Sequence, residues 1–207
     1  ARRCKKAGVD VIVASGHEGG FHTSWDPVHT IVLLPAVVDA VSDANTLVVG
    51  ASGFADGKSV AAAFALGADG VQMGTRFLAT QESDFHPHWK QAVVEAGDRA
   101  TLIARGFVGP ARWLKNARSQ EHAVNTLKKS PGLYIGIPDD YTTTDMSLVE
   151  FEHESMNAVY AGDKEKSMFA AGESAQRIND MPKTADLVQT IMKEAEDTLK
   201  NLSKLVI

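Results

Sequence analysis

The chain has 207 residues, 44% of them hydrophobic and 23% charged, and a formal net charge of −5. These values are typical of a globular protein with a sizeable core, and the negative charge argues against binding to nucleic acid or to an anionic membrane surface. The apolar runs at 31–34 and 60–66 are too short to cross a bilayer. A single cysteine, Cys4, excludes an internal disulfide and fits a reducing compartment, so we expect a cytoplasmic protein.

Three short apolar runs in the first part of the chain predict strands. The run at 9–14 is nearly continuous and β-branched, which is typical of a strand buried on both faces of a parallel sheet. The runs at 47–49 and 70–73 predict two further strands. Helical patterns lie between these runs, and the alternation of strand and helix predicts an α/β fold with a parallel sheet.

Two helices are predicted between these strands. Pro35 favours the first turn of a helix over 35–41, because the first turn does not need the N–H that proline lacks. Asp56 or Ser59 predicts the N-terminal cap of a second helix, which Gly67 ends.

The rest of the chain is predicted to be mainly helical. The segments 87–96 and 112–128 each have a helical pattern, whereas 130–146 is rich in Gly, Pro, Asp and Thr and predicts a long loop. Towards the C-terminus, apolar residues recur at the spacing of one helix face, namely Leu187, Ile191, Ala195, Leu199 and Leu202.

A glycine-bearing loop follows each of the three predicted strands, at 16–22, 50–57 and 74–77. The carboxyl ends of parallel strands meet at one edge of a sheet, and parallel α/β folds bind their ligands at that edge. We therefore expect the three loops to form a single binding site.

The second and third loops have the chemistry of a phosphate site. Small residues let backbone N–H groups point at an anion, and a helix that follows adds the positive end of its dipole. Ser52 and Thr75 offer hydroxyl donors beside Gly53 and Gly74. Tight turns alone would explain either loop, but two such loops after adjacent strands favour a shared phosphate site, as in the last two strands of a TIM barrel.

The first loop holds the residues that can move protons. His22 follows the glycines where the chain leaves the strand, and we predict it as the catalytic histidine, ahead of His17. Glu18 has two interpretations: it orients the loop, or it binds substrate. The other histidines lack the spacing of metal ligands and no cysteine cluster accompanies them, so we predict no transition-metal site.

Three segments together resemble a known family: 16–22 (GHEGGFH), 51–57 (ASGFADG) and 65–77 (ALGADGVQMGTRF). They resemble the nitronate monooxygenases, formerly called 2-nitropropane dioxygenases, and share motifs with the flavin-dependent enoyl-ACP reductases of the same superfamily. The resemblance is strong over 7–80 and continues weakly to the end of the chain, through 112–116 and 172–173. It implies an FMN-binding TIM (β/α)8 barrel followed by a helical region.

The resemblance implies roles for individual residues. His22 stands where the family keeps its active-site histidine. We predict that Glu18 and Phe21, in the same loop, bind the substrate. The residues implied to bind FMN are Gly16, Gly20, Ser52, Gly53, Gly74 and Thr75.

Two positions depart from the family pattern. Family members usually have two glycines where this chain has Ser52 and Gly53, and a serine can still donate to phosphate. They usually read Glu-Ala-Gly-Gly-His, so Phe21 stands where the second of these glycines is expected. A phenyl ring beside the histidine changes the shape of the substrate site.

The resemblance also bears on domain organisation. It places 9–80 at the last three strands of a barrel that takes about 250 residues, so we expect the chain to be part of a longer protein. Its start at Ala1, within a helical pattern and without an initiator Met, agrees with this expectation. We predict the C-terminal part of the barrel over 1–110 and a helical region over 111–207, with a long loop near 130–146.

The activity implied by the resemblance is FMN-dependent oxidation of alkyl nitronates with O2, with His22 as base or hydrogen-bond donor. One alternative is an NAD(P)H-dependent enoyl-ACP reductase, and another is a non-redox phosphate-binding TIM-barrel enzyme. A binding protein without catalytic activity is the last alternative. We expect a small-molecule substrate, with NAD(P)H as co-substrate in the reductase case, and no nucleic-acid or membrane partner; a homo-oligomer remains open.

Overall fold

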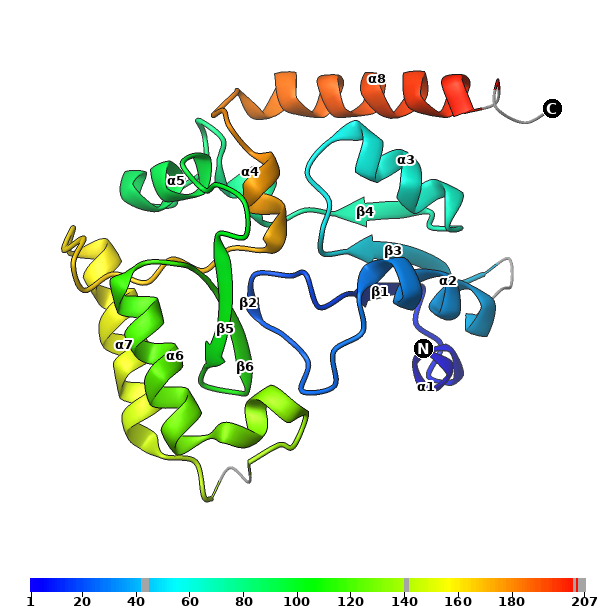
Figure 1. Ribbon diagram of the computed structural model, residues 1–207. Helices are drawn as coiled ribbons and strands as arrows, with labels where there is room; N and C mark the ends of the chain where they lie inside the picture. Colours follow the sequence, from blue (N-terminus) through cyan, green and yellow to red (C-terminus); the bar gives the residue numbers. More distant parts are fainter. Residues whose placement is uncertain (42–44, 140–141, 203, 205–207) are drawn as a thin grey trace.

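The computed structural model of the chain describes residues 1–41, 45–139, 142–202 and 204, and these form two three-stranded sheets that lie side by side (Figure 1). The first sheet has the strand order β1-β3-β4 and the second the order β2-β6-β5. The strands are β1 (Val11–Ser15), β2 (Phe21–His22), β3 (Leu47–Ala51), β4 (Gly70–Gln72), β5 (Thr101–Arg105) and β6 (Pro110–Leu114).

The two helices predicted between the strands of the first sheet, α2 and α3, are present in the predicted order. The α-helices are α1 (Arg2–Lys6), α2 (Thr30–Val41), α3 (Gly57–Ala65), α4 (Thr75–Leu78), α5 (Pro87–Val94), α6 (Ala117–Lys129), α7 (Met146–Tyr160) and α8 (Thr184–Leu202), and the 3-10 helices are η1 (Pro131–Ile135) and η2 (Glu173–Arg177). Among the residues that the structure describes, no helix is both long enough and apolar enough to span a membrane.

The first sheet is parallel throughout, as the sequence predicts, because β1 pairs with β3 and β3 with β4 in the same direction. The face of this sheet that packs against α2 and α3 includes Ile12 and Ala14 of β1, which are 8% and 4% exposed. On the other face Val11 is 45% and Val13 49% exposed. The prediction that this strand is buried on both faces is therefore wrong within the described residues, because the two helices cover a single face and side chains alternate along a strand.

The helix predicted over 35–41 begins earlier than the sequence indicates, at Thr30. Pro35 lies inside α2 rather than in its first turn, where it removes one backbone hydrogen bond. The Glu18 carboxylate fixes the true start, because it accepts hydrogen bonds from the backbone N–H of Thr30 at 2.9 and 3.0 Å. Burial of Leu34 and Val41, which are 0% and 1% exposed, helps to offset the lost hydrogen bond.

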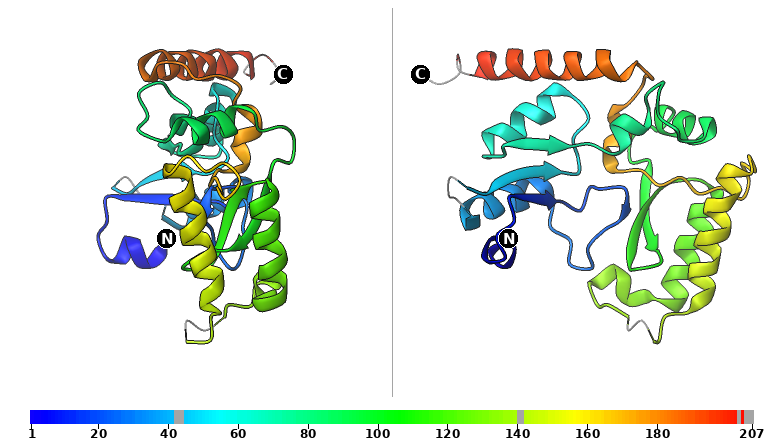
Figure 2. Two further views of the ribbon diagram at one scale, coloured as in Figure 1. Left: turned by 90° about the vertical axis from the view of Figure 1, so that its left-hand side faces the viewer. Right: turned by 180° about the vertical axis from the view of Figure 1, so that it is seen from behind.

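The second predicted helix, α3, is confirmed together with its cap. The Asp56 side chain accepts from the backbone of Ser59, and the Ser59 hydroxyl accepts from the backbone of Asp56, which is a capping box. Gly67 follows the helix with a φ of 91°, a conformation that favours glycine. The predicted C-terminal helix is α8, which lies over α3 and packs on it through Leu187, Ile191 and Ala195 (Figures 1 and 2).

The second sheet departs most from the sequence-based expectations. Residues 112–114 are predicted as the start of a helix, but they belong to β6, and the helix begins at Ala117. All five residues of β6 are buried, because it is the central strand between β2 and β5. Burial on every side conceals the alternating pattern from which an exposed strand is recognised.

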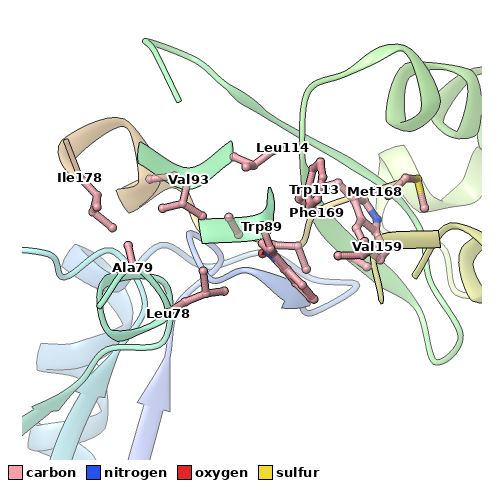
Figure 3. Close-up of a cluster of buried hydrophobic side chains, with 14 of the residues drawn as sticks. Leu78, Ala79, Trp89, Val93, Trp113, Leu114, Val159, Met168, Phe169 and Ile178 are labelled. Atoms are coloured by element: carbon pink, nitrogen blue, oxygen red, sulfur yellow. The ribbon is translucent and has the colours of Figure 1, made fainter. Parts of the chain in front are cut away.

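A hydrophobic core lies against the second sheet and packs together side chains that are far apart in the sequence (Figure 3). Trp89 of α5 is 4% exposed, and its indole N–H donates to the Ala170 carbonyl at 2.9 Å. Trp113 of β6 is 0% exposed and forms an isolated bridge with Ala170. The predicted division between 1–110 and 111–207 falls within β6, and this division stays a prediction.

Glu152 of α7 is a buried carboxyl group, 3% exposed. Burial raises its pKa from 4.5 to about 7, against the smaller opposing effects of the Phe107 backbone and of Arg105. The folded state holds this proton more tightly than the unfolded state, so protonation of Glu152 stabilises the fold. This stabilisation is complete below pH 4.5 and is lost as the pH rises through about 7. At pH 8.5 the loss amounts to about 3 kcal/mol.

We therefore expect Glu152→Gln to have a higher free energy of unfolding than the wild type at pH 8.5. This difference between variant and wild type should be larger at pH 8.5 than at pH 5 by up to about 3 kcal/mol. Urea unfolding at the two pH values measures this difference. Glu150→Gln, at an exposed position on the same helix, serves as the control. A stability difference for Glu152→Gln that does not change with pH would contradict the expectation.

Candidate functional site

A cavity of about 530 Å³ lies between the two sheets, at the carboxyl ends of β1, β3 and β4. All three glycine-bearing loops reach it. Gly16 does not line it: a Cβ at this position would lie 2.1 Å from Thr30 Oγ1, so the missing side chain makes room for α2. The predicted site residues that line the cavity are Glu18, Gly20, Phe21, His22, Ser52, Gly53, Gly74 and Thr75.

The second and third loops present little side chain to the cavity. Ser52 and Gly53 have φ values of 81° and 83°, and the left-handed conformation costs a non-glycine residue about 1–2 kcal/mol. The Ser52 hydroxyl is 3.1 Å from the Ser15 hydroxyl. A Cβ added at Gly74 would meet no heavy atom within 4 Å, so a ligand can approach this backbone closely.

The helix after the second loop does not contribute as the sequence predicts. The Gly57 backbone N–H, at the start of α3, donates to the Glu194 carboxylate of α8 at 2.8 Å. The Ser59 N–H donates to Asp56 at 2.9 Å. Because both groups are already used within the protein, an anion here would depend on the backbone and hydroxyl groups of the loops themselves.

A further segment, 170–174, passes along the cavity and joins its rim. The Gly172 N–H donates to Thr75 Oγ1 at 2.9 Å, and the Glu173 N–H donates to the Glu18 carbonyl at 2.9 Å. A Cβ at Gly20 would lie 2.5 Å from the Gly172 nitrogen, so this glycine permits close packing of the two segments. The faint resemblance at 172–173 was the one sequence signal for this segment.

Arg112 of β6 holds the first loop and this segment together. Its guanidinium donates to the His17 carbonyl at 2.9 Å and to Thr101 Oγ1 at 3.1 Å, and it pairs with the Glu173 carboxylate at 2.8 Å. Arg112 is 4% exposed, and burial lowers its pKa more than the neighbouring Glu173 raises it. A buried guanidinium with three separate partners fixes the relative positions of the segments that carry them.

We expect Arg112→Met to lower the free energy of unfolding by about 2 kcal/mol, because the change removes a buried guanidinium and leaves the His17 carbonyl without its donor, whereas the Glu173 carboxylate, 38% exposed, can be solvated. Chemical denaturation measures the loss. Arg177→Met is the matched control: Arg177 pairs with Asp56 at the same 2.8 Å distance, but its side chain is 63% exposed. The control should lose at most about 1 kcal/mol, and equal losses would contradict the role of burial.

Glu18 uses its carboxylate within the protein. Besides the Thr30 backbone N–H, the Thr30 hydroxyl donates to it at 2.9 Å, and His29 Nδ1 lies 3.7 Å away. These contacts favour the interpretation in which Glu18 orients the first loop, although its side chain also borders the cavity.

His22 and His17 have different positions relative to the cavity. His22 lies in β2, paired with Ala111, and lines the cavity, whereas His17 does not. His22 Nε2 is buried and has no hydrogen-bond partner among the described residues. Burial lowers the pKa of His22 below 6.5, and the charge of Arg105 lowers it further, so the neutral ring predominates at pH 7.

Phe21 has a φ of 62°, although it carries a side chain. Its ring lies 4.2 Å from the His22 ring and 5.5 Å from the Trp113 ring, measured between centroids, and both contacts are edge-to-face. Phe21 and Ser52 are thus the two places where glycine is expected from the resemblance, and both have the backbone conformation that favours glycine.

Comparison with known proteins shows the family of this chain. The family model described as nitronate monooxygenase matches residues 1–194. A Mycobacterium tuberculosis protein named "(3aS,4S,5R,7aS)-5-hydroxy-7a-methyl-1-oxo-octahydro-1H-indene-4-carboxyl-CoA dehydrogenase" is 30% identical over 100% of this chain and 65% of its own length. A Staphylococcus aureus protein named "Probable nitronate monooxygenase" is 33% identical over 82% of this chain and 46% of its own length.

The solved structure of FabK from Thermotoga maritima matches with a TM-score of 0.83 and 35% sequence identity, over 99% of this chain and 60% of that chain. The chain thus spans between about half and two thirds of the length of these relatives. The family model covers both the loops that border the cavity and the segment that crosses it. The chain therefore belongs to the nitronate monooxygenase family.

Proposed function

We propose that the protein is an FMN-dependent oxidoreductase that oxidises alkyl nitronates with O2. One observation carries this proposal: hydroxyl-bearing and glycine loops border one part of the cavity, and His22, whose Nε2 has no hydrogen-bond partner among the described residues, borders another. A phosphate group fits the first kind of surface, and a group that gains or loses a proton fits the second.

The residues present fit an FMN phosphate. Gly74 leaves open space where a side chain would stand, and Gly53 has the positive φ that brings the backbone to the cavity edge. Ser52 and Thr75 would add hydroxyl donors, and Thr75 keeps its own O–H free to donate while its oxygen accepts from Gly172. We propose that β1, β3 and β4 are consecutive strands of a TIM barrel, where such loops bind phosphate.

Bound FMN would supply the redox chemistry, by accepting electrons from the substrate and passing them to oxygen. His22 would act on the substrate side. In its neutral form it can remove the proton next to the nitro group of a nitroalkane, and as a donor it can stabilise the negative oxygens of a nitronate. The Phe21 ring and the walls of the cavity would hold the substrate beside it and exclude water.

An NAD(P)H-dependent enoyl-ACP reductase is a second candidate, favoured by the similarity to FabK. In that case His22 would assist protonation of an enoyl thioester or orient it.

The test uses the purified full-length protein. Flavin absorbance should be present, and oxygen should be consumed on addition of ethyl nitronate in air. NADH with an enoyl thioester, tested without oxygen, should give a much lower rate. A colourless protein would contradict the flavin proposal, and a faster reductase reaction would favour the second candidate.

A further inference from the structure

We infer that Phe21, Trp89, Met156 and Tyr160 form an apolar clamp that binds a ring-sized apolar group on the substrate. The inference rests on the proposed function, since it names the class of nitronate that the same cavity prefers. All four side chains line the cavity that also contains His22.

Phe21 supplies the first side of the clamp. Phe21 has a φ of 62°, and this conformation is less stable by about 1–2 kcal/mol for a residue with a side chain than for glycine. Backbone strain of this kind is found mainly at functional sites. The ring borders the cavity directly beside His22, at 4.2 Å between ring centroids, and it is 37% exposed. The strained backbone of Phe21 thus places an apolar ring beside His22, the proposed reacting residue.

Trp89, Met156 and Tyr160 supply the second side. The Trp89 ring is held by its hydrogen bond to the Ala170 carbonyl and lies 6.4 Å from the Tyr160 ring at an angle of 69° (Figure 3 shows Trp89 within the core). Met156 and Tyr160 occupy one face of α7, four residues apart. The Met156 thioether is flexible and adapts to apolar groups of varied outline, whereas the buried Trp89 ring is held in place.

The two sides are fixed to one another through the core. The Phe21 ring contacts the Trp113 ring edge-to-face at 5.5 Å, and Trp113 bridges to Ala170, the residue that accepts from Trp89. Because Trp113 is 0% exposed, this connection is rigid, and the width of the clamp is set by the fold. We infer that a cyclohexyl or phenyl group contacts both sides of the clamp and that an ethyl group contacts one side only.

The test compares cyclohexyl nitronate with ethyl nitronate as substrates of the FMN-loaded full-length protein. The wild type should have a kcat/KM about tenfold or more higher for the cyclohexyl compound. Phe21→Gly should remove most of this preference while leaving the thermal unfolding temperature unchanged or higher, because the strain is relieved. Met156→Ala should lower the preference in the same direction.

Arg99→Gly is the matched control, because Arg99 is also a non-glycine residue with positive φ, 54°, but does not line this cavity. Its substrate preference should equal that of the wild type. An unchanged preference in Phe21→Gly, or equal kcat/KM values in the wild type, would overturn the clamp and leave the proposed function standing.

A binding measurement separates the two proposals. Titration calorimetry should show tighter binding of cyclohexanecarboxamide than of acetamide by the wild type, and a loss of this difference in Phe21→Gly. If that result is obtained but neither nitronate is oxidised, the clamp is supported and the proposed function fails. If the two amides bind equally, the clamp is overturned.

Discussion

Replacing His22 by asparagine should leave FMN bound but lower turnover with a neutral nitroalkane by about a hundredfold to ten-thousandfold, the usual contribution of general acid–base catalysis. The amide keeps hydrogen-bonding atoms near the cavity but cannot take up a proton at neutral pH. Stopped-flow measurement of flavin reduction without oxygen isolates this step. The loss should appear in the rate and not in the flavin content.

The pH dependence offers an independent check on the same residue. Because burial and Arg105 lower the pKa of His22, the wild-type kcat/KM should stay constant near pH 7 and fall only as the pH drops through a value below 6.5. This acid limb should be absent in His22→Asn. His17→Asn should behave nearly as the wild type, since His17 does not line the cavity; the reverse pattern would show that the wrong histidine has been chosen.

Replacing Gly74 by leucine should abolish retention of FMN by the full-length protein. The new side chain has space, since a Cβ at Gly74 meets no heavy atom within 4 Å, and the residue does not have a positive φ. It would therefore fill the part of the cavity proposed for the phosphate without straining the fold. A flavin-to-protein ratio and a thermal melting curve measure the two effects separately.

Gly97→Leu is the matched control for this substitution. A Cβ at Gly97 also meets nothing within 4 Å, but Gly97 does not line the cavity between the sheets. It should retain flavin fully. Wild-type flavin content in Gly74→Leu would contradict the phosphate assignment, and a large fall in melting temperature would show that the space is not open.

The parallel sheet can be predicted from the sequence because its signals are local. Each strand of this sheet is a short apolar run, and a helix lies between it and the next strand of the sheet. The capping residues Asp56 and Ser59 are three positions apart, which is the spacing of a capping box. The start of α2 is different. It depends on the Glu18 carboxylate, which lies outside the helix, so Pro35 in the sequence points to the wrong boundary.

The second sheet is hard to predict because its causes are distant. The strand β2 has two residues and exists through pairing with β6, and Arg112 within β6 is buried because the His17 carbonyl and Glu173 are brought to it by the fold. A charged residue in an apolar run normally indicates a surface helix or loop. The loops of the candidate site were predictable from glycine placement, whereas the segment 170–174 was not, because its contacts join remote positions.

The hydrogen bond from Gly172 to Thr75 joins residues 97 positions apart in the sequence, and this separation affects the order in which the protein folds during synthesis. A ribosome delivers the N-terminal strands and loops first, so the parallel sheet can form while the segment that closes the cavity is still unsynthesised. Closing so long a loop is slow compared with local folding. On the proposed function, flavin would bind only after translation of that segment. A bound flavin would then mark the molecules that are translated to this point and correctly folded.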